Sequence, residues 1–275
     1  MAADLHLHTN FSDGTYTPEE LAAHAHRLGF GAVSLTDHDT MGGCPRMAAA
    51  CAGLGIEFIA GSELTCEHEG QELHLLGYFL DMGNQKLADA LEKFQGVRVN
   101  RIREIIARIN AMGVKLDAQR VFDLANCRSP GRPHVGRALV EAGICSGLDE
   151  AFERFLKKGK PAWVPKYRMI ASEAIGLIHQ SGGLASLAHP GLYRADHVIP
   201  DLVAAGMDAL ECFYTRHSTA LTEHYLMLAD EHRLLVTGGS DCHGMNKGRP
   251  LIGAIRLPSH FIEKLKARVA ARRAA

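Results

Sequence analysis

The first decisive stretch of the chain, residues 4–36, reads DLHLHTNFSDGTYTPEELAAHAHRLGFGAVSLT. It contains a short apolar run, a helix start and a second apolar run. Thr17 is the expected N-cap of this helix, Pro18 takes its first position, and Glu20 completes a capping box. A strand, a helix and a strand in succession predict one β-α unit of a parallel sheet or barrel.

The same alternation continues along most of the chain. Strand-like apolar runs lie at 5–8, 32–36, 57–61, 73–78, 184–188, 209–213 and 234–237. In the middle of the chain they give way to helical periodicity, with helices expected at about 117–125, 133–142 and 149–158. We therefore predict an α/β barrel-type domain formed by residues 1–82 and 166–275, and an all-helical insertion at residues 83–165.

The composition is that of an ordinary folded protein, with 47% apolar residues, 22% charged residues and a formal net charge of −1. No apolar run is long enough to span a bilayer, and the first residues lack the pattern of a signal peptide. Seven cysteines without a C-x-x-C pair fit a reducing compartment, so we expect a cytoplasmic protein without membrane contact. Sixteen histidines are the unusual count, and histidine is the commonest metal ligand.

Charge is distributed unevenly. Residues 83–160 hold 15 Lys and Arg against 9 Asp and Glu, an excess of six positive charges, so the rest of the chain carries seven negative ones. Acidic ligands in the barrel would hold cations, and a basic insertion would attract an anionic substrate. An equally weighted alternative is that the positive charges only form a solvated face.

The first signal with chemical content is the pair His6 and His8. Residues two apart in a strand point to one face, so both imidazoles can bind one metal. Asp13, in the turn that follows, adds a carboxylate, although Asx hydrogen bonding in that turn would also explain it. An isolated H-x-H is a weak signal.

Further polar residues follow, or interrupt, the other apolar runs. Together they give nine candidate metal ligands, which are His6, His8, Asp13, His38, Glu63, His74, His189, Asp241 and His243. Taken singly, His74 is better explained as a core histidine. In β/α barrels, however, the carboxyl ends of the strands converge on one active site. Because one four-coordinate cation needs only about three protein ligands, nine candidates predict two or three cations.

These motifs resemble those of the PHP (polymerase and histidinol phosphatase) family. The matching segments are Asp4-Leu-His6-Leu-His8-Thr9, Ser12-Asp13-Gly14, Thr36-Asp37-His38-Asp39, Gly61-Ser62-Glu63, Ala188-His189-Pro190 and Gly239-Ser240-Asp241-Cys242-His243-Gly244. The resemblance implies a distorted seven-stranded (β/α) barrel with up to three metals, most often Mn²⁺ and otherwise Fe²⁺ or Zn²⁺. It also implies a ligand set for each metal: His6, His8 and Asp241 with a bridging Glu63; His74 and His189 with Glu63; and Asp13, His38 and His243.

The insertion resembles that of stand-alone bacterial PHP proteins acting on nucleotides. In the segment Ser129-Pro-Gly-Arg132-Pro-His134-Val-Gly-Arg137, the resemblance places Ser129, Arg132 and His134 at the substrate, and Lys166 is a weaker candidate. Arginine suits a phosphate because its planar fork gives two parallel hydrogen bonds.

The resemblance implies a metal-dependent phosphoric ester hydrolase. We predict hydrolysis of the 3′-phosphate of nucleoside 3′,5′-bisphosphates by hydroxide from a water between the metals, with Asp37, His38 and Asp241 as catalytic residues. The alternatives are a 5′–3′ exoribonuclease acting on short RNA ends, a histidinol-phosphatase-like enzyme, a C–N amidohydrolase, and a non-catalytic metal- or RNA-binding module. The complete ligand set argues against the last. The sequence leaves the oligomeric state open.

Overall fold

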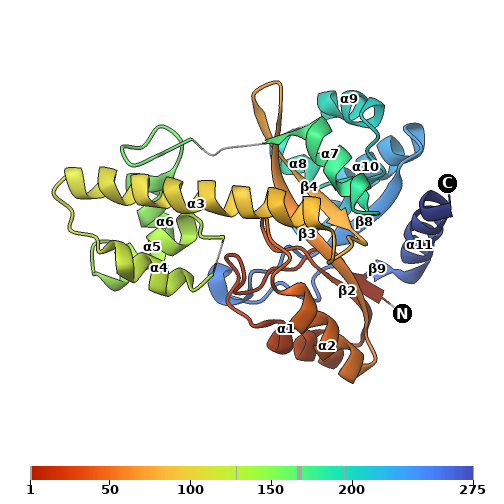
Figure 1. The fold of residues 1–275 in the computed structure, drawn as a ribbon, viewed down its shortest axis with the longest axis horizontal. Coiled ribbons are helices and arrows are strands. Elements are labelled where there is room, and N and C mark those ends of the chain that lie inside the picture. The colour runs from red at the N-terminus through yellow and green to blue at the C-terminus, as the bar shows by residue number, and fades with distance from the viewer. Residues whose placement is uncertain (1, 128, 166–168, 195, 275) are drawn as a thin grey trace.

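The computed structural model describes residues 2–127, 129–165, 169–194 and 196–274. It shows a body built around a sheet and a helical lobe that extends from it along one long helix (Figure 1). Among the described residues, no helix is long and apolar enough to cross a membrane.

The sheet forms a nearly closed barrel. Its strands are β1 (Ala2–Asp4), β2 (Phe30–Leu35), β3 (Glu57–His68), β4 (Gln71–Tyr78), β5 (Met169–Ile170), β6 (Leu184–Leu187), β7 (Ala209–Tyr214), β8 (Leu235–Gly239) and β9 (Leu257–Pro258). They follow the order β8-β7-β6-β4-β3-β2-β1-β9, with β5 beside β3. Strand β4 runs antiparallel to β3 and β6, and β9 antiparallel to β1. The predicted α/β fold class is confirmed.

The barrel closes where the first residues of the chain meet β8. Leu5 N donates a hydrogen bond to Gly238 O at 3.1 Å, and His8 N donates to Cys242 O at 3.0 Å. A Cβ on Gly239 would lie 2.3 Å from the backbone nitrogen of His6. Only glycine therefore allows the two segments to approach so closely.

Two predicted strands differ from the observed ones. Strand β1 ends at Asp4, so His6 and His8 lie in the extended segment after it, where Leu7 forms an isolated bridge with Cys242. Strand β3 continues past the predicted end at residue 61, because β4 folds back on it as a hairpin and supplies backbone partners as far as His68. Glu63 thus lies inside a strand and not after its end.

Helices cover the outside of the barrel (Figure 1). They are α1 (Pro18–Arg27), α2 (Cys44–Leu54), α7 (Ala171–Gln180), α8 (Pro190–Tyr193), α9 (Ile199–Ala204), α10 (Thr219–Glu231) and α11 (Ser259–Ala274). The capping box of α1 is present as predicted, since Glu20 N donates to Thr17 Oγ1 at 3.2 Å and Thr17 N donates to Glu20 Oε2 at 2.8 Å.

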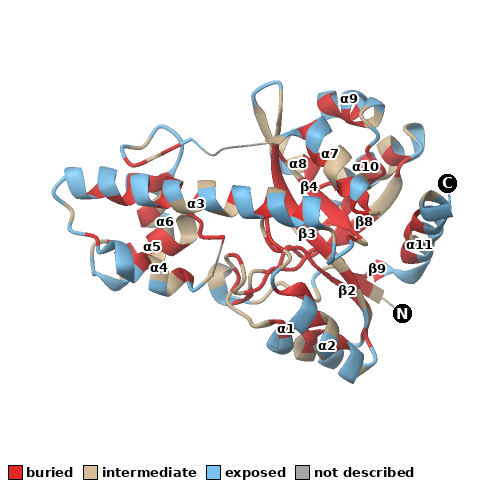
Figure 2. Cartoon of the chain, viewed as in Figure 1, coloured by how far each residue is buried: buried red, intermediate tan, exposed pale blue. Residues whose placement is uncertain are grey.

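The helical lobe has its own apolar core. It contains α3 (Gln85–Ala111), α4 (Ala118–Ala125), α5 (Arg132–Glu141) and α6 (Leu148–Ala151), which continues into one π-helical segment (Phe152–Leu156). Ile102, Ile105 and Ile109 of α3 pack there against Val121 and Leu139, and Figure 2 shows these helices buried along their facing sides. The buried members of this core run from Ile102 to Val164.

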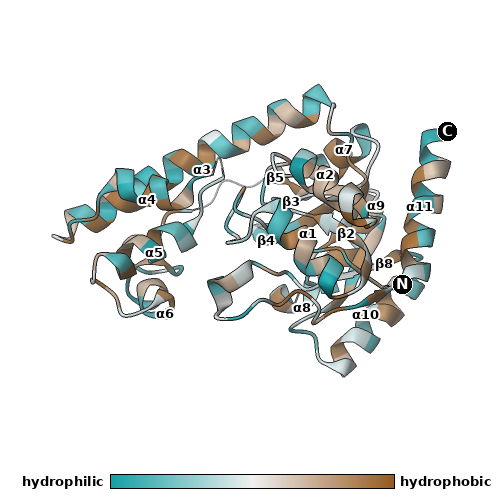
Figure 3. Cartoon of the chain, turned by 90° about the horizontal axis from the view of Figure 1, so that it is seen from below, coloured by the Kyte–Doolittle hydropathy of each residue, from teal (hydrophilic) through white to brown (hydrophobic). Residues whose placement is uncertain are grey.

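Helix α3 joins the lobe to the barrel. Its first turns bury Leu87, Leu91 and Phe94 in the core of the barrel, whereas its later turns belong to the core of the lobe. Figure 3 shows α3 leaving the body and running out over α4 and α5. Helix α3 therefore contributes to both cores.

Candidate metal centre

The Glu63 carboxylate is the centre of the site. It is 1% exposed and lies on β3 among histidines brought from other segments of the barrel. Its Oε1 lies 2.6 Å from His74 Nδ1 and 3.1 Å from His189 Nε2. Its Oε2 faces three further rings: His38 Nδ1 at 3.0 Å, His8 Nε2 at 3.3 Å and His6 Nε2 at 3.4 Å. One buried carboxylate thus stands between two sets of imidazoles.

Asp241, directly after β8, is the second shared carboxylate. Its Oδ1 lies 3.3 Å from His8 Nε2, 3.6 Å from His6 Nε2 and 3.3 Å from His243 Nδ1. Its Oδ2 accepts a hydrogen bond from the Tyr214 hydroxyl at 3.0 Å. This contact leaves Oδ1 facing the imidazoles.

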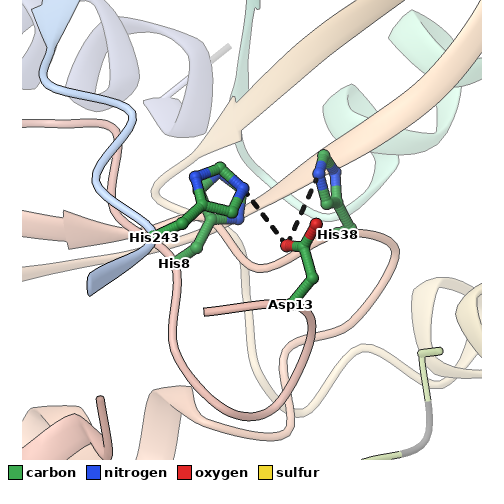
Figure 4. A group of neighbouring side chains, drawn as sticks. All are labelled: His8, Asp13, His38 and His243. Atoms are coloured by element: carbon green, nitrogen blue, oxygen red, sulfur yellow. Dashed lines mark ion pairs between the residues drawn. The ribbon is translucent and has the colours of Figure 1, made fainter. Parts of the chain in front are cut away.

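A third group lies at the outer edge of the centre. Asp13 Oδ1 is 3.2 Å from His243 Nε2 and 3.8 Å from His38 Nε2, and the His8 ring stacks on His243 with centroids 4.1 Å apart. Figure 4 shows the Asp13 carboxylate between the rings of His243 and His38. The turn containing Asp13 therefore brings its carboxylate to the histidines.

The donor set fits divalent cations. Among the described residues, His6 Nε2, both ring nitrogens of His8, His38 Nδ1 and Glu63 Oε2 are buried without a hydrogen-bond partner. Leaving so many polar atoms unpaired in an interior is costly. Two ligand atoms that each lie at about 2.1 Å from a shared cation are about 3.0 to 3.4 Å apart. The separations around Glu63 Oε2, from 3.0 to 3.4 Å, have this size.

The carboxylates stay ionised. Burial opposes the charge on Glu63, but the histidines around it, above all His38, hold its pKa well below the ordinary value. Burial likewise opposes the charge on Asp13, and His243 and His38 hold its pKa well below the ordinary value. Burial acts to lower the pKa of His8, but the carboxylates of Asp241 and Glu63, each 3.3 Å from its Nε2, raise it to about 9. A cation at His8 would compete with a proton for its ring nitrogen.

Glu211, inside β7, orients two of the histidines and was not predicted. Its Oε1 lies 3.0 Å from His6 Nδ1, and its Oε2 accepts a hydrogen bond from His189 N at 2.6 Å. A hydrogen bond at Nδ1 leaves Nε2 as the metal-binding nitrogen, the usual role of a carboxylate behind a histidine ligand. The available signal was a carboxylate within the apolar strand Ala209–Tyr214, where burial demands a partner.

A cleft of about 1350 Å³ connects the metal centre with the lobe. Asp13 and His243 line it from the barrel, and Pro133, Phe152 and Lys157 line it from the lobe. A substrate bound at the cations would therefore contact the insertion as well.

Comparisons with known proteins agree with this geometry. Residues 4–121 match the model of the PHP domain. The chain is 33% identical over 260 residues to the 3′,5′-nucleoside bisphosphate phosphatase of Chromobacterium violaceum, covering 91% of this chain and 90% of the relative. The chain belongs to the PHP family.

Two further comparisons cover almost the whole PHP chain. It is 32% identical over 247 residues to the 5′–3′ exoribonuclease Rnm of Salmonella typhimurium, covering 87% of this chain and 84% of the relative. A crystal structure of a protein assigned as a metal-dependent phosphoesterase, from Bifidobacterium adolescentis, superposes with a TM-score of 0.89 at 29% identity, covering 97% of this chain and 96% of that one. The predicted family is confirmed.

The structure brings all nine candidate ligands of this PHP chain together. Four overlapping groups have ligand atoms within 4.8 Å of one another: His8, Asp13, His38 and His243; His6, His8 and Asp241; His6, Glu63 and His189; and His38, Glu63 and His74. His74, which looked like a core histidine on its own, is one of them.

Asp37 was predicted as a catalytic residue, and its surroundings argue for a different role. Its Oδ1 accepts hydrogen bonds from Thr9 N at 2.8 Å and Ser12 Oγ at 2.6 Å, and its Oδ2 accepts one from Thr9 Oγ1 at 2.5 Å. The carboxylate thus faces the turn that carries Asp13, and not the cation ligands. We infer that Asp37 positions this turn, whereas His38 and Asp241 lie in the centre itself.

The predicted substrate-binding residues of the lobe are bonded within the chain. Arg132 Nη1 donates to Leu156 O at 3.0 Å, and Ser129 Oγ donates to His38 O at 2.7 Å. His134 Nδ1 accepts a hydrogen bond from Gly131 N at 2.9 Å, and burial lowers the pKa of His134 to about 4, so its ring is neutral. Lys166 lies outside the described residues.

Proposed function

We propose that this PHP protein is a metal-dependent phosphoesterase that removes the 3′-phosphate from nucleoside 3′,5′-bisphosphates. The observation that carries this proposal is the buried Glu63 carboxylate, which stands between two sets of imidazoles in a cleft open to a second, basic lobe. The 33% identity to a 3′,5′-nucleoside bisphosphate phosphatase over most of both chains supports the choice of substrate.

We assign the nine side chains to three cations, two of which would share Glu63. One set is His6, His8 and Asp241; the second is His74 and His189; the third is Asp13, His38 and His243. When bound, divalent cations acidify a water toward neutral pH and neutralise the charge that develops on the phosphoryl oxygens. Mixed imidazole and carboxylate ligands without a thiolate fit Mn²⁺ or Fe²⁺, and we propose Mn²⁺.

Neighbouring residues hold these ligands in place. Glu211 fixes the tautomer of His6, Tyr214 turns Asp241 Oδ1 toward the imidazoles, and Asp37 holds the turn of Asp13. Because each contact uses an atom that faces away from the proposed cations, the ligand atoms keep facing them. The ligands are therefore arranged before a substrate binds.

A second candidate is the 5′–3′ trimming of short RNA. The cleft of about 1350 Å³ exceeds the roughly 300 to 1,000 Å³ of ordinary small-molecule sites, so it has room for more than one nucleotide. The 32% identity to the exoribonuclease Rnm also supports this candidate.

The test uses protein stripped of metal with a chelator and then supplied with Mn²⁺. Adenosine 3′,5′-bisphosphate and a short 5′-phosphorylated RNA are compared by release of inorganic phosphate and of nucleotide. We expect no hydrolysis before Mn²⁺ is added, and faster phosphate release from the bisphosphate afterwards. Faster nucleotide release from the RNA would instead favour the second candidate.

Two controls make the result decisive. Glu63→Gln should lose activity because one shared carboxylate is removed, whereas Glu223→Gln, on the exposed side of α10, should keep it. Full wild-type activity in the presence of the chelator would refute metal dependence.

We also propose that the protein acts in the cytoplasm. All seven cysteines are free thiols, and six of them are buried. Unpaired thiols are typical of proteins kept in a reducing compartment.

A further inference from the structure

The Arg137 side chain, on α5, has hydrogen-bond donors with no partner. Its Nε and Nη2 are buried, and no described residue accepts a hydrogen bond from either atom. The other partly or fully buried arginines in the described part of the lobe differ: Arg98 donates to Asp39 at 2.6 Å, Arg101 to Val164 O at 3.0 Å, and Arg132 to Leu156 O at 3.0 Å. Buried polar groups are nearly always paired, so this exception points to a ligand.

The unpaired atoms form the edge of the guanidinium that binds oxyanions. Elsewhere in this chain, Arg46 uses Nε and Nη2 to bind both oxygens of Glu19 at 2.8 and 2.7 Å. Arg120 binds both oxygens of Glu141 through the same two nitrogens. A carboxylate or a phosphate is the group that fits such a fork.

Arg137 lies one turn of α5 from a residue that lines the cleft. Pro133, one turn earlier on the same face of α5, lines the cleft together with Asp13 and His243. Long side chains of a helix generally point back toward its N-terminus, and for Arg137 this is the direction of Pro133. Arg137 also lines a smaller hollow of about 300 Å³, and this hollow shares Leu148 with the cleft.

Electrostatics places Arg137 on the Asp13 side of the metal centre. Burial lowers the pKa of Arg137, and the charge of Asp13 acts in the opposite direction. The pKa of His134, one turn of α5 away, is lowered by the charge of Arg137 and raised by the charge of Asp13. No described residue forms an ion pair with Arg137, so its positive charge is available to an anion that enters from the metal centre.

We propose that Arg137 binds the second phosphate of the substrate, the one that is not cleaved. Arg137 would thereby select substrates that carry two phosphates. The inference rests on the proposed function and assigns one residue of the lobe to it. The cations take the phosphate that reacts, and the Nε–Nη2 edge of Arg137 takes the other, either a terminal phosphate or the next phosphodiester of an RNA.

The experiment compares full-length wild type, Arg137→Met and Arg137→Lys in Mn²⁺. Substrates are adenosine 3′,5′-bisphosphate, adenosine 3′-monophosphate and a short 5′-phosphorylated RNA. We expect Arg137→Met to lower kcat/KM for the bisphosphate by roughly 10- to 100-fold, mainly through KM, because a charge-assisted bidentate contact is lost. The kcat/KM of Arg137→Met for the monophosphate should stay within about twofold of the wild-type value. For the bisphosphate, the kcat/KM of Arg137→Lys should lie between those of the wild type and Arg137→Met, because lysine offers a single point charge.

Arg120→Met is the matched control. Arg120 has the same guanidinium group in the same lobe, but it forms an ion pair with Glu141 on the surface. It should leave the preference for the bisphosphate unchanged. Arg137→Met should also unfold at the wild-type temperature or above it, because an unpaired buried charge is removed. A clear drop in the unfolding temperature, with equal losses on all substrates, would show a structural role and overturn the proposal.

Binding measurements keep the two hypotheses apart. Calorimetry on metal-free protein gives the ratio of the Kd values for the monophosphate and the bisphosphate without turnover. If the wild type hydrolyses nothing but binds the bisphosphate more tightly, and Arg137→Met loses that difference, the proposed function fails and the assignment of Arg137 stands. An unchanged Kd ratio in Arg137→Met refutes the assignment whatever the enzyme hydrolyses. A loss seen with the bisphosphate alone identifies a terminal phosphate, and a loss with the RNA alone identifies a phosphodiester.

Discussion

Replacing Glu211 with glutamine tests how the metal ligands are oriented. Two donors point at this buried carboxylate, the His6 ring at Nδ1 and the backbone N–H of His189. Glutamine offers one acceptor oxygen where glutamate offers two. If that oxygen keeps the short contact with His189 N, the amide NH₂ faces His6 Nδ1. The His6 ring must then move its proton to Nε2, the nitrogen that faces Glu63 and Asp241.

The expected loss of Mn²⁺ affinity follows from this mismatch between donors and acceptors. Loss of a carboxylate behind a ligating histidine typically weakens metal affinity by about 10- to 100-fold, which corresponds to roughly 1.4–2.7 kcal/mol. Losing one hydrogen bond to a charged group costs a similar amount, roughly 1.5–3 kcal/mol. We therefore expect Glu211→Gln to raise the Kd for Mn²⁺ by about 10- to 100-fold.

The assay is calorimetric titration of metal-free protein with Mn²⁺, followed by activity at saturating Mn²⁺. Activity should largely return at high Mn²⁺ if orientation of the ligands is the only defect. Glu223→Gln, which removes an exposed carboxylate of α10, serves as the control. A Kd for Mn²⁺ equal to that of the wild type would refute the role given to Glu211.

Three other substitutions test the fold and the site. Gly239→Ala should lower the free energy of unfolding by roughly 1–3 kcal/mol or more, measured in urea, because the new methyl group meets the backbone of His6. Asp208→Asn should lower it by roughly 2–4 kcal/mol at neutral pH, because a buried partner of Arg272 is lost. Burial acts to raise the pKa of Asp208, but its hydrogen bonds, including those from Arg272, hold the pKa below 3.8. This stability is present above pH 3.8 and is lost as pH falls through the lower folded-state pKa, so unfolding curves of variant and wild type should converge in acid. Asp37→Asn should destabilise the turn that carries Asp13 and so raise the Kd for Mn²⁺. The pH–rate profile should keep both its acidic and its basic limb. Loss of one limb would instead show that Asp37 acts as a proton donor.

The candidate ligands stand out in the sequence because most of them interrupt or follow an apolar run. His6, His38, Glu63 and Asp241 are polar residues at positions where burial is expected, and such residues need partners. The β-α alternation likewise predicted the α/β fold correctly. Sequence motifs of this kind report chemistry and local structure together.

What the sequence could not show is which atom faces which partner. The hairpin of β3 and β4 depends on pairing between residues 57–68 and 71–78, so the true length of β3 was not visible locally. Asp37 and His38 are neighbours in the sequence, yet Asp37 bonds to Thr9 and Ser12 on another segment. In the lobe, Arg132 and Arg137 lie in one motif, and only the three-dimensional contacts distinguish the paired guanidinium from the unpaired one.

The most direct test of the metal centre is anomalous X-ray diffraction from crystals soaked in Mn²⁺. Glu63, with His74 and His189 on one oxygen and the other histidines on the second, should bridge two cations. We expect at least two anomalous peaks, each roughly 2.0–2.2 Å from an oxygen of Glu63. Peaks only at the exposed group of His68, Glu69 and Asp201, with none beside Glu63, would contradict the account.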